Sequence, residues 1–428
     1  MRRAALAAAL TALTAATACT EDVTAPGHCP DFCPSGSITG VDTVLQTVVQ
    51  RDSAFRGFVR PHEARSLLAA TLPGVIDGRA IVLLVPVGQR LVVGTGGDTT
   101  TGAIVGVDSL RLTVTITRRD TSAHNLTLVY YRLPLDLDST KTFADLAGAW
   151  TTADSLRSLN VDSVYALAGH VDLLRGDSVF VDTLTNRVTV IAKLDSAMAP
   201  YVVADSGKAA FGIRVVADSR ASIALGSVEA GLGPLLTWFA EADSVAKDTV
   251  PRSSTVGVRF DSFVFDLLSP SVDTTLDSTL AVGGMPVARS IMRFALPRLI
   301  RDSVQISRAT LVLVTARPPE GVPADSFTLS AHGVLADFSA KSPLSPDPSR
   351  VATTRVHIGI ARGDTVRIEM ADILRSWQID TLAPTALALR QIPEGMEFPE
   401  IRFEPSTNVA LAPALHVTYV KRFPFGKP

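Results

Sequence analysis

The sequence predicts an all-β protein built from two tandem antiparallel β-sandwich domains. Short runs rich in Val, Ile, Leu and Thr recur roughly ten residues apart and are bounded by Asp, Ser, Gly and Pro. Several runs alternate apolar and polar residues with a period of two, as half-buried strands do. The two halves of the chain also resemble each other, and 428 residues exceed what one hydrophobic core usually holds.

Residues 1–18 have the layout of a secretory signal peptide. Arg2 and Arg3 precede a short apolar run, which is shorter than the ~20 residues that a membrane-spanning helix needs. Ala16-Thr17-Ala18-Cys19 resembles the lipobox of bacterial lipoproteins. That resemblance implies diacylglycerol on Cys19 and, because Thr20 replaces Asp, an exported protein anchored to the cell envelope at the outer membrane. The alternative is an ordinary cleaved signal followed by an incidental cysteine.

Residues 19–40 are rich in turn-forming residues and are predicted to be a flexible tether. Cys29 and Cys33 lie four residues apart in an oxidising compartment, which favours a local disulfide. His28 suggests a metal site as the alternative. Such a site needs further ligands, and the chain has no second Cys/His cluster, so no metal is expected.

The remaining chain is predicted to consist mainly of strands. Clear examples are residues 80–85, 109–116, 126–131, 187–191, 310–314 and 415–420. Helical periodicity is scarce, and short helices are expected only at residues 145–159 and 371–377.

The chain contains an internal repeat, which we place at residues 41–250 and 251–428. Residues 64–73 and 288–297 align without a gap and share five of ten positions. Residues 211–214 likewise match 387–390, and residues 235–239 match 414–419, in the same order along the chain. The first copy has extra residues around 78–102, where a Gly-rich turn predicts an inserted hairpin.

The second copy also resembles a known secreted module. Residues 289–297, 306–313 and 366–377 are similar to the DNRLRE-type family, with Met292 and Ala295 departing from its pattern. The resemblance covers about 150 residues. It implies a jelly-roll-like antiparallel sandwich outside the cell, in a family of which some members bind polysaccharide.

Within the strand at 289–297, alternation sends Ile291 and Arg293 to one face and Met292 and Phe294 to the other. Arg289 and Arg293 are expected to have structural roles, such as pairing with Asp.

Motifs for catalysis are missing from the sequence. None of the seven histidines has the spacing of a helical zinc site, no Gly-x-Ser-x-Gly occurs, and no phosphate-binding loop is present. Aspartates followed by Ser or Thr recur, including Asp52, Asp138, Asp177 and Asp261. We interpret them as turn formers, with calcium binding or glycoside hydrolysis as the alternatives.

The best candidate for a glycan contact is Trp150 together with Tyr130 or Tyr131. Adjacent tyrosines in a regular strand face opposite sides, so one of them is expected to be exposed. Trp238 and Trp377 are instead expected in the core.

These observations predict a non-catalytic, lipid-anchored protein of the cell envelope that acts as a structural or interaction module. The alternatives are a carbohydrate-binding surface lipoprotein and, third, a polysaccharide hydrolase. The expected partners are the membrane, through the N-terminal lipid, and an envelope protein or polysaccharide at the cell surface. A net charge of −2 gives no basis for nucleic-acid binding, and no cofactor is expected.

Overall fold

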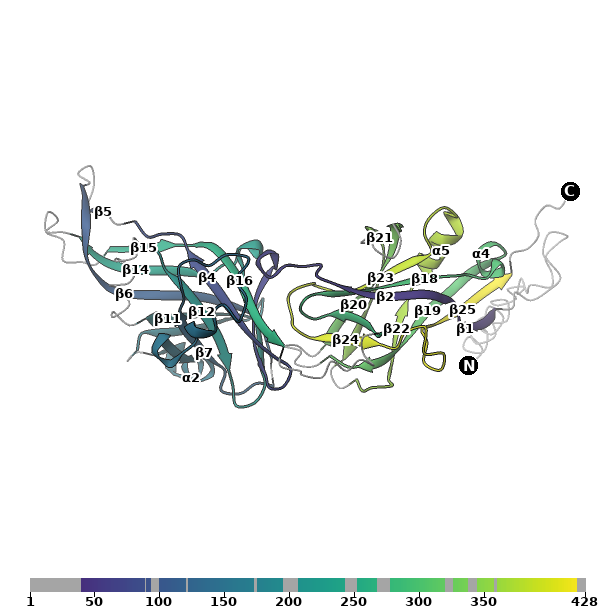
Figure 1. Cartoon of the computed structure of the whole chain (residues 1–428), viewed down its shortest axis with the longest axis horizontal. Helices are drawn as coiled ribbons and strands as arrows, with labels where there is room; N and C mark the ends of the chain where they lie inside the picture. The colour runs from purple at the N-terminus through teal and green to yellow at the C-terminus, as the bar shows by residue number, and fades with distance from the viewer. Residues whose placement is uncertain are drawn as a thin grey trace, which may run out of the picture.

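The computed structural model describes residues 40–88, 90–93, 100–120, 122–172, 175–194, 207–242, 252–267, 278–319, 326–337, 345–357 and 360–421. These described residues are mostly β, with 57% strand and 11% helix, and their strands form two large antiparallel curled sheets. Each curled sheet encloses one core, and the two lie end to end (Figure 1). The predicted all-β, two-sandwich architecture is therefore confirmed.

Domain 1 is the sheet with the order β8-β7-β12-β4-β3-β13-β6-β11-β10-β9, to which β5, β14, β15 and β16 are added. Its strands are β3 Ser66–Leu72, β4 Ile76–Leu84, β5 Arg90–Val93, β6 Thr100–Arg119, β7 Thr127–Arg132, β8 Ser155–Asn160, β9 Val171–Asp172, β10 Asp177–Asp182, β11 Arg187–Leu194, β12 Ala210–Val216, β13 Ala221–Gly226, β14 Leu235–Ala242, β15 Arg252–Val256 and β16 Val258–Leu267.

Domain 2 is the sheet with the order β1-β25-β19-β24-β17-β18-β23-β20-β21, with β2 added beside β18 and β22 beside β19. Its strands are β1 Val41–Leu45, β2 Val49–Arg56, β17 Leu280–Gly283, β18 Ala288–Phe294, β19 Val304–Arg317, β20 Ser326–Ala336, β21 Ser345–His357, β22 Thr365–Glu369, β23 Ala386–Gln391, β24 Glu400–Phe403 and β25 Ala414–Lys421.

Helices are few and short in the described part of the chain. The α-helices there are α2 Val161–Ala166, α4 Arg298–Asp302 and α5 Ala371–Ile379, and the 3-10 turns are Pro61–Glu63, Ala147–Ala149, Thr152–Asp154, Ala168–His170 and Val228–Ala230. The predicted helix at 371–377 is confirmed as α5, which packs Trp377 against Phe294 with ring centroids 5.4 Å apart. The helix predicted at 145–159 is wrong, because that segment forms two 3-10 turns and then β8.

Each domain has its own apolar core, built by the predicted period-two alternation. In β25, Leu415, Val417 and Tyr419 are buried while His416 points outward. Trp238 belongs to the core of domain 1 and Trp377 to that of domain 2, as predicted. Arg293, on the face of β18 opposite Met292 and Phe294, pairs with Asp337, which confirms its expected structural role.

The two sheets share one topology. Reading across domain 1, β8-β7-β12-β4 is followed by β3-β13-β6, and across domain 2, β21-β20-β23-β18 is followed by β17-β24-β19. In both domains a further strand lies along the central one, with β16 on β4 and β2 on β18. The terminal pairs also correspond, since β15 pairs with β14 and β1 pairs with β25.

The chain does not divide between these sheets at the predicted repeat boundaries. Residues 40–56, which we call the N-terminal arm, carry β1 and β2 and pair with β25 and β18 of domain 2. Conversely, β15 and β16 pair with β14 and β4 of domain 1. Domain 1, β3 to β16, is therefore continuous in sequence and is inserted between β2 and β17, the second and third strands of domain 2.

The register also corrects one part of the repeat alignment. Residues 64–73 contain β3, whose topological equivalent is β17, whereas residues 288–297 contain β18, the equivalent of β4. The other matches agree with the sheets, because Phe211 pairs with Val82 of β4 as Leu387 pairs with Met292 of β18. The predicted inserted hairpin is confirmed as β5 and the start of β6, at the place where domain 2 has α4.

The two domains meet through a shared apolar cluster. Phe398, in the loop between β23 and β24, lies on the outer face of domain 1, with its ring centroid 5.8 Å from that of Phe263 and 6.2 Å from that of Phe265. A Cβ added at Gly78 would lie 2.5 Å from the Phe398 ring, so β4 needs glycine at this crossing. Arg118 of domain 1 forms an ion pair with buried Glu397 beside this cluster.

Candidate functional site

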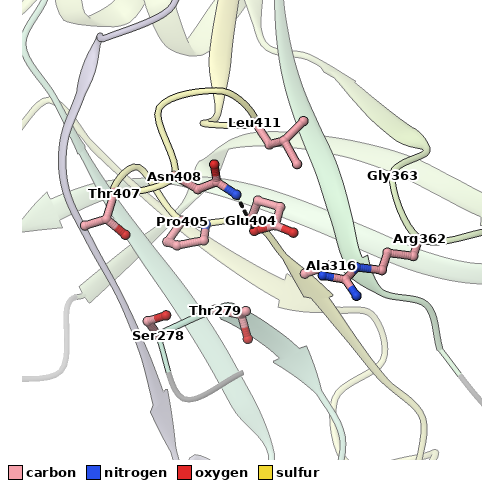
Figure 2. A pocket seen from close by; sticks show the side chains of 10 residues that line it. All are labelled: Ser278, Thr279, Ala316, Arg362, Gly363, Glu404, Pro405, Thr407, Asn408 and Leu411. Carbon is pink, nitrogen blue, oxygen red and sulfur yellow. Dashed lines mark hydrogen bonds between the residues drawn. The ribbon is translucent and has the colours of Figure 1, made fainter. Parts of the chain in front are cut away.

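The candidate site is a pocket of about 400 Å³ in domain 2, which we call the Glu404 pocket (Figure 2). Its walls come from four segments: the residues before β17, the strand β19, the turn before β22 and the turn after β24. The lining residues are Ser278, Thr279, Ala316, Arg362, Gly363, Glu404, Pro405, Thr407, Asn408 and Leu411. The volume is at the lower end of the range for small-molecule sites.

Glu404 is the buried charge of the pocket. The residue is only 9% exposed, and the Asn408 Nδ2 donates a hydrogen bond of 3.0 Å to its Oε2. Among the other buried carboxylates of the described chain, Asp177 pairs with Arg157 and Glu397 with Arg118, whereas Asp120 and Asp261 make no ion pair there. Glu404 likewise makes no ion pair within the described residues, so its charge lacks the compensation that a buried charge normally has.

Arg362 supplies the positive charge of the pocket. The turn that carries it is fixed to β19, because the Gly363 N–H donates to the Thr315 carbonyl and the Thr315 N–H donates to the Asp364 carbonyl, both at 2.8 Å. The Arg362 side chain is exposed and is directed toward Glu404 (Figure 2). The two are not within ion-pairing distance, so each presents its charge to the space between them.

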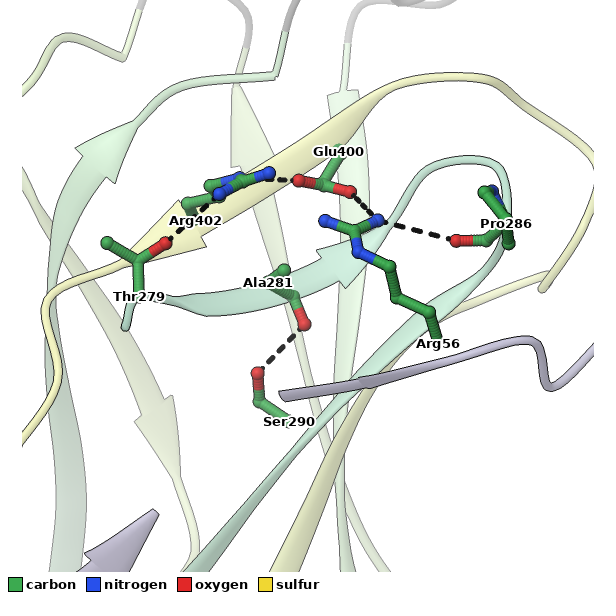
Figure 3. Close-up of polar contacts among 7 residues, drawn as sticks. All are labelled: Arg56, Thr279, Ala281, Pro286, Ser290, Glu400 and Arg402. Carbon is green, nitrogen blue, oxygen red and sulfur yellow. Dashed lines mark hydrogen bonds and ion pairs between the residues drawn. The ribbon is translucent and has the colours of Figure 1, made fainter. Parts of the chain in front are cut away.

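The N-terminal arm holds one wall of this pocket. Asp52 of β2 accepts a hydrogen bond of 2.6 Å from the Ser406 N–H, which fixes the turn that follows Glu404. Figure 3 shows a second connection, in which Arg56 of the arm pairs with Glu400 and Arg402 Nε donates to Glu400 Oε1 at 2.6 Å. The hydrogen bond that Arg56 donates to Glu400, together with the Glu400 charge, raises the pKa of the Arg56 guanidinium.

Domain 1 has the same turn in a closed form. Asp261 of β16 accepts from the Val228 N–H at 2.9 Å, as Asp52 does from Ser406, so Gly226 of domain 1 corresponds to Glu404. The turn of domain 1 folds onto Gly226, where an added Cβ would lie 2.4 Å from the Leu232 carbonyl oxygen. Domain 2 therefore carries a glutamate at the position where domain 1 has Gly226 under its turn.

Asp261 makes the stability of domain 1 dependent on pH. Burial, reinforced by the nearby Glu229, raises the pKa of Asp261 to about 6. The folded state therefore holds this proton more tightly than the unfolded chain, and stability falls as pH rises from about 4 to 6. We expect Asp261→Asn, which can still accept from Val228, to raise the free energy of unfolding by about 2 kcal/mol at pH 8 in urea titrations.

The increase in the free energy of unfolding caused by Asp261→Asn is expected to shrink toward zero at pH 4, where the parent carboxyl is already protonated. Asp372→Asn, at a 95% exposed side chain, is the matched control and is expected to show no such pH-dependent gain. An equal gain for Asp261→Asn at both pH values would contradict the assignment.

The predicted glycan contacts do not form an exposed platform. Tyr130 is fully buried in the core of domain 1, where burial and the charge of Asp177 raise its pKa. Tyr131 faces the other side of the sheet but is only 7% exposed, since Trp150 covers it edge-on at 5.2 Å. The expectation that one tyrosine faces solvent is wrong, because the segment between β7 and β8 folds back over the strand.

Trp150 itself is half-buried and is held by structural contacts. Its ring lies on Gly212, where an added Cβ would come within 2.3 Å, and Arg79 lies 4.8 Å from the ring centroid. Its indole Nε1 is buried without a hydrogen-bond partner. This tryptophan therefore covers β12 and offers little surface to a ligand.

The remaining predicted residues have mixed outcomes. Cys19, Cys29 and Cys33 lie outside the described residues. Asp138 caps a local turn by accepting from the Thr140 N–H at 2.8 Å, as predicted. The turn prediction is wrong for Asp52, Asp177 and Asp261, which lie in strands and bind backbone groups far away in sequence.

Sequence reasoning missed the Glu404 pocket. Glu404 follows a strand of four residues and carries no motif, and the lining residues Arg362 and Thr279 are distant from it in sequence. Within the described ranges, no group of three or more His, Cys, Asp and Glu side chains is placed to hold a metal ion. No helix in the same part of the chain is long and apolar enough to cross a membrane.

The fold and pocket together define a two-domain β-sandwich protein with a small polar cavity in its second domain. Comparison of the chain with protein-family models finds no match, and neither does comparison with curated proteins. The resemblance to the DNRLRE-type module therefore stays a prediction.

Proposed function

We propose that this protein is a non-catalytic, lipid-anchored structural or interaction module of the cell envelope, exported and attached through Cys19. The observation that supports this proposal is the placement of the chain's first described strand. β1 lies at the end of domain 2 that is remote from domain 1 (Figure 1). A tether leading from a lipid to β1 would put domain 2 next to the membrane and present domain 1 away from it.

The contact between the domains supports the same function. An apolar cluster and the Arg118–Glu397 ion pair join the domains, so domain 1 would be held out on a fixed support. A spacer that presents a distal domain to an envelope partner requires this kind of connection. The alternative of carbohydrate binding at Trp150, Tyr130 and Tyr131 has no support from their buried positions.

Two fluorescent labels on the vesicle-bound lipoprotein test this arrangement. Leu184 in domain 1 and Leu382 in domain 2 are 94% and 95% exposed, so cysteines there should accept a dye without disturbing the fold. We expect energy transfer to a dye in the bilayer to be stronger from Leu382→Cys than from Leu184→Cys. Mass spectrometry of the same preparation is expected to find a chain that begins at acylated Cys19.

Cys19→Ser is the control and is expected to leave the protein unbound to vesicles, since nothing else attaches it. An unmodified Cys19, cleavage at another residue, or stronger transfer from domain 1 would each contradict the proposal. Specific retention of the protein on a cell-surface polysaccharide, tested by pull-down, would favour the carbohydrate-binding alternative instead.

A further inference from the structure

We propose that the Glu404 pocket binds a small zwitterion, whose ammonium group is received by Glu404 and whose anionic group is received by Arg362. This site goes beyond the proposed envelope function and does not depend on it. The proposal rests on the cavity, on its buried carboxylate, and on the difference between the two copies of the fold.

The wall around Glu404 is rich in hydrogen-bond acceptors. A carboxylate only accepts, and one of the two Asn408 Nδ2 hydrogens is already donated to Glu404. Thr407 and Ser278 add hydroxyl oxygens. An ammonium group carries three donors and a positive charge, so it satisfies these acceptors and also compensates the buried charge.

The opposite wall favours an anion. The Arg362 guanidinium only donates, and its planar fork matches a carboxylate. Because Arg362 and Glu404 do not pair with each other, a ligand with both charges can lie between them and neutralise both. A neutral polyol would leave the buried carboxylate without a counter-charge, and a simple anion would be repelled by it.

The repeat supplies an independent comparison. At the corresponding place in domain 1 the turn is packed onto Gly226, and the carboxylate buried beside it, Asp261, accepts from the Val228 N–H of the turn. Domain 2 shows that this fold can also keep the turn open, with Leu411 at the rim and a glutamate beneath it. Burying the Glu404 charge has a desolvation cost, and a bound cation would offset this cost.

Isothermal titration calorimetry of the full-length protein tests the site with four probes. 4-Aminobutyrate carries both charges, butylamine only the positive one, butyrate only the negative one, and glucose neither. We expect 4-aminobutyrate to bind, butylamine to bind about tenfold more weakly, and butyrate and glucose to show no binding.

Three variants locate the binding. Glu404→Gln keeps an oxygen for Asn408 and is expected to weaken 4-aminobutyrate binding at least about tenfold. Arg362→Ala is expected to weaken it about fivefold, whereas Arg355→Ala, at an exposed arginine on β21, is expected to leave it unchanged. Thermal melting of each variant shows that the fold is retained.

The proposal is overturned if 4-aminobutyrate does not bind, if glucose binds as well as it does, or if Glu404→Gln binds like the parent. None of these results depends on lipidation, so the membrane-anchor proposal stands or fails separately.

Discussion

Deletion of the N-terminal arm, residues 40–56, is expected to unfold domain 2 while domain 1 stays folded. The arm pairs along the whole of β18 and along β25, and it contributes Val48 and Val49 to the core of domain 2. It also supplies Asp52 and Arg56 to the turns around the Glu404 pocket. Losing these contacts should cost more than about 5 kcal/mol, which is comparable to the stability of a whole domain.

Limited proteolysis and calorimetry of a chain that begins at Gly57 measure this loss. The protected fragment is expected to contain β3 to β16, because those strands form the continuous sheet of domain 1. Removing only residues 1–39 is the control and is expected to leave the melting temperature of domain 2 unchanged. Protection of domain 2 in the chain that lacks the arm would contradict the strand pairing.

Transfer of the arm to the other end of the chain is expected to restore domain 2. In domain 1 the corresponding strand, β15, simply follows β14 and pairs with it after a connection of residues 243–251. A permuted chain in which a linker of similar length joins Lys421 to residues 40–56 should therefore refold both sheets. This rescue separates the loss of the arm's contacts from a nonspecific effect of truncation.

Phe398→Ala is expected to make the two domains unfold independently of each other. The ring is only 6% exposed and fills the cluster between Phe263, Phe265 and Gly78. Removing a buried phenylalanine costs about 3–5 kcal/mol. Because that energy belongs to the domain contact, we expect a single calorimetric transition of the parent to become two transitions in the variant.

Phe180→Ala is the matched control, since Phe180 of domain 1 is 46% exposed and lies outside the shared cluster. It is expected to leave the number of transitions unchanged. Two transitions in the parent protein, or one in Phe398→Ala, would show that the cluster does not couple the domains.

Much of the fold could be predicted from local pattern. The alternation in β25 and around Met292 of β18, the core positions of Trp238 and Trp377, and the helix α5 all follow from the spacing of apolar residues. The repeat was visible for the same reason, because equivalent strands bury equivalent positions. These signals depend only on residues close together in sequence.

Strand pairing and the pocket could not be predicted in that way. A strand's pattern records which face is buried and does not record which neighbour it pairs with. The sequence of residues 40–56 does not show whether the strand that pairs with them follows directly or lies beyond residue 280, as β18 does. The Glu404 pocket likewise combines four distant segments, and the cover over Tyr131 depends on how the residues after β7 fold back.

The insertion of domain 1 into domain 2 also sets the order in which the two sheets can be completed as the chain is synthesised. Domain 1 has all its strands once residue 267 has emerged, and it can then complete its sheet. β1 must wait for β25, and the contact between Asp42 and Thr418 closes across 376 residues. Until then the arm has unpaired strand edges, which invite aggregation, and contacts of such long range form slowly. The first described strands to be synthesised, β1 and β2, are therefore among the last to be paired.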